Sequence, residues 1–434
     1  MGTPTAPAPP VGRAQRALIG VLAYRPDVDG RILVGVVVAV YFVTISVFRA
    51  VWGINIWPGL GVPAAPSLFF DTRVVTAGLE CRRLGMDPLV NNPCDPLGRP
   101  FNYPRVWLLL RYLGLGQSHT DVLAIVFIAA FLGALFFLFG RISLGEGAIV
   151  AAALCSPSVM FGVERANMDI VIFAFLVIAV VLWRRESALG EVASPVVVLL
   201  AALLKVFPAF GLLAYPLVRR RRATVAALLC MGVFAIYAIV TRSDIASIAH
   251  GTPQGQENAY GVRILPVAIY HRFVPERWQG GAVIKQLLAA VPVLICLPVV
   301  WRIGRRRLPR LDAGAGNWRR LAFHLGALIF LGTFAAFNNF DYRLVFLLLM
   351  LPQLIEWTTS PSDPRGPLAA TTTVGLLVLL WMGALSAQLD LWDEVATWVT
   401  IVLVLTLLCA CIPYARKAAV EESRGGPRDS ARAG

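Results

Sequence analysis

Charged and amide side chains interrupt this apolar sequence at a few places, and their types suit proton transfer and phosphate binding. Asp71 lies in the segment 67–73, about twenty residues after the first apolar run ends. A carboxylate at the mouth of an apolar site can act as general base for a hydroxyl. The alternative interpretation is that Asp71 caps the N-terminus of a helix over residues 72–84.

A second polar group, Glu164, Arg165, Asn167 and Asp169, separates two apolar runs. An arginine at a membrane edge is costly unless it pairs with an acid or binds an anion, so it predicts a binding site. An ion pair of Arg165 with Glu164 or Asp169 would instead hold a tight helical turn. Both interpretations can hold at once.

Two further places carry a basic side chain. Lys205 stands alone between apolar neighbours, so it either reaches a membrane interface or faces a cavity, where it would hold a phosphate as a point charge. Asp341 and Arg343 open a late apolar run. They form a structural pair, or Arg343 faces a lipid phosphate while Asp341 orders an acceptor hydroxyl.

The cysteines and histidines predict no metal centre. The seven cysteines show no Cys-x-x-Cys spacing and the four histidines are far apart, so we expect no metal ligands and no cofactor. Cys81 and Cys94 are the only cysteines in the polar region 52–120. In an oxidising compartment they could form a disulfide worth on the order of 3 kcal/mol, the alternative being two free thiols.

The composition places the chain in a membrane. Hydrophobic residues make up 58% and charged residues 15% of 434 residues, against roughly 45–50% and about 25% in soluble domains. The apolar runs approach the length that crosses a bilayer. We therefore expect an all-α polytopic membrane protein with about twelve helices, near 32–51, 121–139, 146–163, 168–183, 192–204, 206–218, 223–241, 282–301, 321–337, 344–356, 368–386 and 395–413.

The basic residues predict how the chain is oriented. Lysine and arginine cluster in short segments between apolar runs, as in cytoplasmic loops, and this pattern argues against nucleic-acid binding. One topology satisfies every cluster, with both termini on the cytoplasmic side of the cell membrane. The basic clusters are Arg184 with Arg185, 219–222, 302–310, and Arg416 with Lys417.

This topology implies three regions. Residues 1–31 form a cytoplasmic tail, 32–413 a single transmembrane domain, and 414–434 a disordered cytoplasmic tail. The first apolar run is longer than a signal-peptide core, so we expect it to be retained.

Two segments of this domain need a special arrangement. The stretch 192–218 must cross an even number of times within 27 residues, which predicts a broken pair of short helices meeting near Lys205 and Pro208; a single straight span is the alternative. Residues 52–120 form a large extracytoplasmic loop with amphipathic helices. One amphipathic patch, 101–111, would place its aromatic side chains at headgroup level. The polar segments would then converge on one outward-facing cavity.

Three stretches together resemble the integral-membrane glycosyltransferases of the C superfamily, specifically glycosyltransferase family 87. They are Asp71 with the later Leu84-Gly-Met-Asp87-Pro88, then Glu164-Arg-Ala-Asn167 with Ala202-Leu-Leu-Lys205-Val-Phe-Pro208 and the arginines 219–222, and finally Phe340-Asp-Tyr-Arg343. Glu-Arg stands where the family usually has Gly-Gln, and Tyr-Arg stands where histidine is common. These departures leave the sugar and the acceptor open.

The resemblance implies a membrane fold of the glycosyltransferase C type and an inverting, metal-independent hexosyl- or pentosyltransferase. Its donor would be a polyprenyl-phosphate sugar, mannose or similar, and its acceptor a lipid or glycan of the cell envelope. Asp71 would be the catalytic base, and Lys205 with the segment 341–343 would line the active site. Arg165, Lys205 and Arg343 would stabilise the phosphate leaving group, beside Glu164 and Asn167.

Two other classes of protein remain as alternatives. A transporter or flippase of lipid-linked saccharides also uses broken helices and buried charges, but it usually has two related halves and a site near the midplane. A polymerase or ligase of surface polysaccharide tends to carry its key arginines in a large late outer loop. Here the largest polar loop comes early, and no internal repeat is visible.

Overall fold

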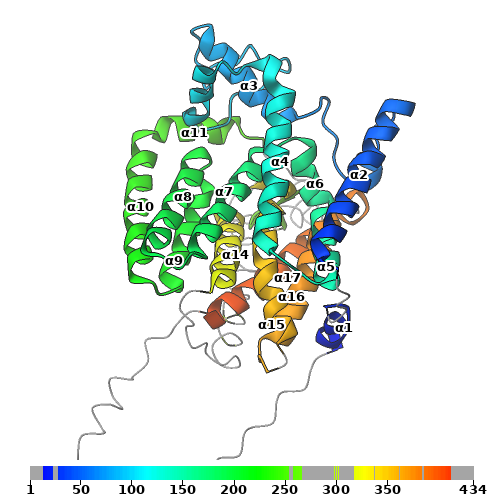
Figure 1. Cartoon of the computed structure of the whole chain (residues 1–434). Coiled ribbons are helices and arrows are strands. Elements are labelled where there is room, and N and C mark those ends of the chain that lie inside the picture. The colour runs from blue at the N-terminus through cyan, green and yellow to red at the C-terminus, as the bar shows by residue number, and fades with distance from the viewer. Residues whose placement is uncertain are drawn as a thin grey trace, which may run out of the picture.

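The computed structural model is built almost wholly of helices (Figure 1). It describes residues 13–22, 28–253, 258–265, 298, 300, 302, 317–336, 338–360, 362–383 and 386–411. The expected apolar run 282–301, the basic cluster 302–310 and the tail 414–434, which holds Arg416 and Lys417, lie outside these ranges, apart from single residues.

Five helices of the described chain are long and apolar enough to cross a membrane, and a bent pair makes a sixth. The expectation of an all-α membrane protein agrees with this, while the number of twelve spans stays a prediction. Among the described segments, the long helices are α2 (Gly30–Trp52), α4 (Thr120–Phe139) with the short η3 (Gln117–His119) before it, α10 (Arg221–Val240), α14 (Trp318–Ala336) and α17 (Ser386–Cys411).

The run expected as one span near 146–163 is bent in the structure. Helix α5 (Leu144–Leu154) and helix α6 (Pro157–Glu164) meet at 59°. Pro157 is the first residue of α6. Proline has no backbone N–H and disfavours a helical conformation in the residue before it, so the first helix ends there and a second one begins.

Helix α7 (Met168–Trp183) forms the centre of the structure. It is apolar all round its circumference, and 12 of its 16 residues are buried. A helix of this kind must be enclosed by other helices, and α7 packs against α4, α8, α14 and η6. The first turn of α7 is therefore buried. It also lies at the end of the helices onto which the polar region packs.

The chain folds back at Lys205, as the sequence predicts. Helix α8 (Ala188–Leu204) runs to this residue, and the 3₁₀ helix η4 (Phe207–Leu213) returns through α9 (Ala214–Leu217). An ion pair of 3.2 Å between Arg220 and Glu191 joins the end of the hairpin to its start. Few residues suffice for the return because a 3₁₀ helix rises about 2.0 Å per residue, against 1.5 Å in an α-helix.

The polar region after α2 packs onto one end of the helices (Figure 1). It contains η1 (Pro58–Leu60), α3 (Phe70–Arg83) and η2 (Arg105–Leu113), and a disulfide joins Cys81 to Cys94. The patch 101–111 differs from the expectation. Its aromatic residues Phe101, Tyr103 and Trp107 are buried rather than placed at a surface, because the Trp107 indole donates to the Leu204 carbonyl at 2.9 Å and the Phe101 ring fills the space beside Gly78.

The C-terminal half closes the structure around α7. The 3₁₀ helix η6 (Asp341–Met350) continues into α15 (Leu351–Thr359), and α16 (Gly366–Met382) packs beside α17. A two-residue antiparallel ladder pairs β1 (Ala259–Tyr260) with β2 (Asn339–Phe340). The ladder ties the loop that follows α11 (Arg242–Gly251) to the start of η6.

The basic groups and the polar segments lie at opposite ends of the helices. Arg184, at the end of α7, donates to the Phe137 carbonyl at 2.7 Å and lies 3.5 Å from the Trp318 ring centroid. Asp169 begins the same helix, so roughly 22 Å separates the two residues at 1.5 Å per residue. In Figure 1, α1 (Arg13–Leu22) and the red end of α17 lie with α9 and α15 at the bottom, whereas α3 and α11 lie at the top.

The disulfide should stabilise the outer region. We expect Cys94→Ala to lower the free energy of unfolding by about 3 kcal/mol, because the bond closes a loop of about fourteen residues. Thermal unfolding of the purified protein in detergent measures this. The variant lacking both Cys81 and Cys94 should lose no more than the single variant, and peptide mapping without reductant should recover the two cysteines as one linked pair. Free thiols at both positions would refute the bond.

Candidate functional site

Asp71 and the turn between α6 and α7 are held together by several hydrogen bonds. The Asn167 amide donates to the Asp71 carboxylate at 2.5 Å, and Arg165 Nη1 lies 3.8 Å from its other oxygen. The backbone N–H of Asp71 donates to the Arg165 carbonyl at 3.2 Å, and Thr72 Oγ1 donates to the Ala166 carbonyl at 2.7 Å. Asp71 accepts from another segment and gives no cap to its own helix, so the helix-cap interpretation is wrong.

Both segments that meet here contain a residue with a strained backbone. Phe69 has φ of 54° and Ala166 has φ of 44°. These values lie in the left-handed region, which non-glycine residues rarely adopt. Such strain persists where the surrounding contacts impose it, and it concentrates at functional sites. The two strained residues lie two positions before Asp71 and one position before Asn167.

A buried carboxylate joins two basic side chains from distant segments. Asp169 Oδ1 lies 2.5 Å from Lys205 Nζ, and Asp169 Oδ2 lies 3.3 Å from Arg343 Nε. The side chain of Asp169 has no exposure to solvent, while those of Lys205 and Arg343 keep 14% and 11%. Burial of charges without partners is very costly, so the three groups hold one another in place and leave the two cations facing open space.

Amide side chains complete this arrangement. Asn167 caps α7 by accepting from the Asp169 N–H at 2.8 Å, and the same amide oxygen lies 3.3 Å from Lys205 Nζ. Asn339 accepts from Arg343 Nη1 and donates to the carbonyls of Thr333 at 2.8 Å and Tyr260 at 3.2 Å. The orientation of Arg343 therefore depends on the ladder between β1 and β2.

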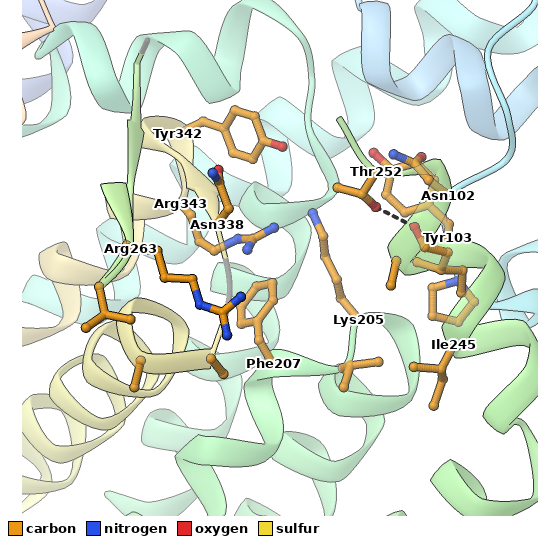
Figure 2. Close-up of a pocket in the computed structure, with 18 of the residues that line it drawn as sticks. Asn102, Tyr103, Lys205, Phe207, Ile245, Thr252, Arg263, Asn338, Tyr342 and Arg343 are labelled. Atoms are coloured by element: carbon orange, nitrogen blue, oxygen red, sulfur yellow. Dashed lines mark hydrogen bonds between the residues drawn. The ribbon is translucent and has the colours of Figure 1, made fainter. Parts of the chain in front are cut away.

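These cations face a cavity of about 510 Å³ (Figure 2). One wall is polar and carries Lys205, Arg343 and Arg263, while Ile245 and Ile248 of α11 contribute to an apolar wall. Figure 2 shows the Lys205 amine and the Arg343 guanidinium pointing into the same space. The remaining lining residues are Asn102, Tyr103, Pro104, Val206, Phe207, Ala249, Thr252, Gly261, Val262, Ile264, Ala335, Ala336, Asn338 and Tyr342.

Asp71 connects with this cavity through Asn167. The Asn167 amide donates to Asp71 through its nitrogen and accepts from Lys205 through its oxygen. The Tyr103 phenol lies close enough to Asp71 and Asp169 to be affected by their negative charges. Burial, with the negative charges of Asp71 and Asp169, holds its pKa well above the ordinary value. Tyr103 therefore stays protonated at the cavity wall.

Of the residues expected in the site, only Lys205 and Arg343 line the cavity. Asp71, Arg165 and Asn167 adjoin it through the contact of Asn167 with Lys205, whereas Glu164 and Asp341 lie apart from this group. The Glu164 carboxylate is buried and accepts from the Ala65 N–H at 3.1 Å. Asp341 is buried at the start of η6, near the carboxylate of Asp393 in α17. Neither residue is part of the cavity lining.

The ion pairs differ from the alternatives that the sequence leaves open. Arg343 pairs with Asp169 and not with Asp341, and Arg165 approaches Asp71 rather than Glu164 or Asp169. Arg165 also lies over the rings of Phe161 and Phe70, at 4.5 and 5.2 Å. The partners are distant in sequence, so spacing alone could not reveal them.

Several residues of the site carry no strong signal in the sequence. Asn339, Tyr103 and Arg263 lie in polar or loop segments that contain many such residues. Asp169 is different, because an acid two residues after a capping asparagine and inside an apolar run is unusual enough to notice. What it binds becomes apparent only when α8 and η6 pack against α7.

An ion-pair cluster fastens the apolar wall of the cavity to the outer region. Arg105 makes two hydrogen bonds to Asp87, at 2.8 and 2.9 Å, and one to Asp244 of α11 at 2.7 Å. The Arg105 guanidinium, through these hydrogen bonds, holds the pKa of Asp87 below its ordinary value. The hydrogen bond from Arg105 of η2 to Asp244 of α11 therefore holds the helix that carries the apolar wall against the outer region.

The donor set gives no sign of a metal centre in the part of the chain that the structure describes. No group of three or more histidine, cysteine or acidic side chains comes together there. The polar cavity offers cations instead, and these favour an anionic ligand.

Fold and site together define a polytopic helical membrane protein with a cationic cavity beside a carboxylate. The family model of glycosyltransferase family 87 matches residues 101–316, a range that includes Arg165, Asn167 and Lys205 but neither Asp71 nor Arg343. The chain belongs to glycosyltransferase family 87. No curated protein and no solved structure matches it.

Removing the central carboxylate should destabilise the protein. Asp169→Asn leaves Lys205 and Arg343 buried without a counter-charge, so we expect a loss of about 3 to 5 kcal/mol in the free energy of unfolding. Adding Lys205→Met to Asp169→Asn should recover part of this loss, because one unpaired cation is then gone. Thermal unfolding in detergent gives both values.

The exposed Asp121 offers a matched control for this pair of variants. Asp121→Asn should leave the unfolding midpoint within error of the wild type. If the losses from Asp169→Asn and Lys205→Met simply added, the two side chains would not be coupled.

The cluster at Arg105 should depend on pH. Because the pKa of Asp87 is lowered below 3.8 in the folded protein, its pair contributes stability at neutral pH and loses it as pH falls below that value. Asp87→Asn should cost about 1 kcal/mol at pH 7, and the difference from the wild type should narrow below about pH 4. Unfolding midpoints across this range measure it, with Glu80→Gln at the exposed Glu80–Arg83 pair as control. A difference that stays constant with pH contradicts the assignment.

Proposed function

We propose that this glycosyltransferase moves a sugar, mannose or a similar hexose or a pentose, from a polyprenyl phosphate to a hydroxyl of a lipid or glycan acceptor. The single observation that carries the proposal is the cavity, which sets two cations from Lys205 and Arg343 opposite an apolar wall. A lipid-linked phosphate presents the matching chemistry, an anion next to a hydrocarbon chain. One such ligand would place its phosphate at the two cations and its hydrocarbon chain along the apolar wall.

The arrangement supports a direct displacement. The acceptor oxygen attacks the anomeric carbon, the bond from this carbon to the phosphate oxygen breaks, and Asp71 takes the proton of the acceptor hydroxyl. The phosphate leaves with the bonding electron pair, and Lys205 and Arg343 stabilise the charge that it gains. Attack from the side opposite the leaving group inverts the anomeric centre.

Arg165 and Asn167 position the base in this proposal. The Asn167 amide donates to Asp71 at 2.5 Å and contacts Lys205 at 3.3 Å, so it links the base to a phosphate-binding cation. Arg165 Nη1 lies 3.8 Å from the Asp71 carboxylate and helps to hold it in place. Because the cations supply the positive charge, we propose that transfer needs no metal.

The site opens at the end of the helices away from the arginines at 184 and 220. Since basic segments stay on the cytoplasmic side, we propose that the reaction takes place on the extracytoplasmic face of the cell membrane, with both termini in the cytoplasm. The donor's hydrocarbon chain would lie along the apolar wall formed with α11. The protein would thus belong to the machinery that builds the cell envelope.

Asp71→Asn tests the assignment of the base. Membrane vesicles with the wild-type chain and a labelled polyprenyl-phosphate sugar should form a glycosylated product, and the variant should lose at least about 100-fold in rate because no group takes the proton. Its folding should change little, since asparagine keeps the shape of the side chain. Mass spectrometry of the product gives the rate, and NMR of the product gives the anomeric configuration.

Asp121→Asn serves as the control, and the wild-type rate should persist in the presence of EDTA. Undiminished transfer by the Asp71 variant would remove this residue from catalysis. Movement of the lipid-linked sugar across the vesicle membrane without a new glycosidic bond would favour a transporter instead.

A further inference from the structure

Arg263 is a third cation at the cavity, and the sequence pattern does not single it out. It follows β1 in the loop after α11 and lines the same space as Lys205 and Arg343 (Figure 2). Unlike those two residues, Arg263 is exposed, so it stands at the mouth of the cavity.

The backbone around Arg263 is well fixed. The Val262 N–H donates to the Phe334 carbonyl at 2.9 Å, and the Ile264 N–H donates to the Gly261 carbonyl at 3.1 Å. The adjoining ladder from β1 to β2 also holds Asn339, which binds Arg343. One local structure therefore positions both arginines toward the cavity.

The charges at the cavity suggest what Arg263 does. Lys205 and Arg343 share the buried Asp169, so these three groups carry one net positive charge. In the described part of the chain Arg263 makes no ion pair, and no carboxylate lines the cavity. With Arg263 the net charge at the cavity rises to two.

The net charge of one without Arg263 and of two with it matches the charges of the proposed ligand before and after transfer. A sugar linked to a lipid monophosphate is a phosphodiester with one negative charge, and the released lipid phosphate is a monoester carrying about 1.5 to 2 negative charges at pH 7. The single net positive charge of Lys205, Arg343 and Asp169 balances the single negative charge of the donor. Only the third cation balances the charge that appears when the bond from sugar to phosphate breaks.

We propose that Arg263 contacts the phosphate and stabilises the charge that develops on it, so that the cavity favours the lipid monophosphate leaving group over the intact donor. This inference rests on the proposed glycosyl transfer. The planar guanidinium suits two phosphate oxygens at once. Its position at the mouth lets it remain hydrated while the cavity is empty.

The test compares Arg263→Gln with the wild-type full-length chain in lipid nanodiscs. We expect kcat to fall about 100-fold, as for the loss of one group that stabilises developing charge. Equilibrium binding of a short-chain polyprenyl monophosphate should weaken about tenfold. The KM for the sugar donor should rise by a smaller factor, because the donor carries less charge at the same phosphate.

Two further variants make the comparison specific. Arg263→Lys keeps the charge without the planar fork and should recover part of the lost binding. Arg242→Gln removes an exposed arginine of α11 that does not line the cavity, and it should behave as the wild type. Arg263 is exposed, so its replacement should leave the unfolding midpoint unchanged.

The binding arm separates this inference from the proposed function. If the wild type transfers no sugar, the proposed transfer fails, yet weaker polyprenyl monophosphate binding by Arg263→Gln would still support the phosphate contact. Equal binding by Arg263→Gln, Arg242→Gln and the wild type would overturn the contact. Equal losses for donor and monophosphate would overturn the preference for the leaving group.

Discussion

A carboxylate without solvent exposure, Asp169, lies between Lys205 and Arg343, and the arrangement of the cavity depends on this contact. The three residues come from the first turn of α7, the end of α8 and the first turn of η6. Removing Asp169 would leave two largely buried cations without a counter-charge, whereas removing Lys205 or Arg343 would still leave Asp169 one partner. The same interaction therefore binds three segments together and aims two cations at open space.

The helices make this contact possible by where they stop. Helix α7 is enclosed on all sides, yet its N-terminus reaches the polar end of the molecule, where Asn167 caps it. A helix N-terminus carries a partial positive charge and favours an acid in its first turn. Helix α8 ends at Lys205 because the chain turns back there, and η6 begins just after the short β2 strand. Each charged side chain thus belongs to the end of an element.

The outer region contributes the proposed base, Asp71, beside the cluster of Asp169, Lys205 and Arg343. Its α3 is fixed by the disulfide, by the buried aromatic residues of the segment before and within η2, and by the contacts of Asp71 with the turn after α6. The strained backbone of Phe69 and Ala166 lies at this junction. Family membership gives the chemistry as glycosyl transfer, and the proposed roles of Asp71, Lys205 and Arg343 follow from how the outer region meets the helices.

Much of the architecture can be predicted from the sequence because it depends on local properties. Several apolar runs correspond to helices of the described chain, the two basic clusters that the structure describes, Arg184 with Arg185 and 219–222, lie at one end, and the short stretch 192–218 predicts the hairpin at Lys205. The bend at Pro157 and the burial of the aromatic patch at 101–111 differ from the expectations that the sequence supports. Hydrophobicity and proline content describe a segment without saying which neighbour it packs against.

The site divides in the same way. Asp71, Arg165, Lys205 and Arg343 can be selected from the sequence because a charged residue beside an apolar run is rare, and such residues need a partner or a ligand. Only the tertiary structure decides the partners, since Asp169 meets Lys205 and Arg343 across 36 and 174 positions of the chain. It also leaves Asp341 outside the cavity lining and brings Arg263 to the cavity. Residue type sets the cost of burying a charge, whereas packing sets which opposite charge is near enough to offset it.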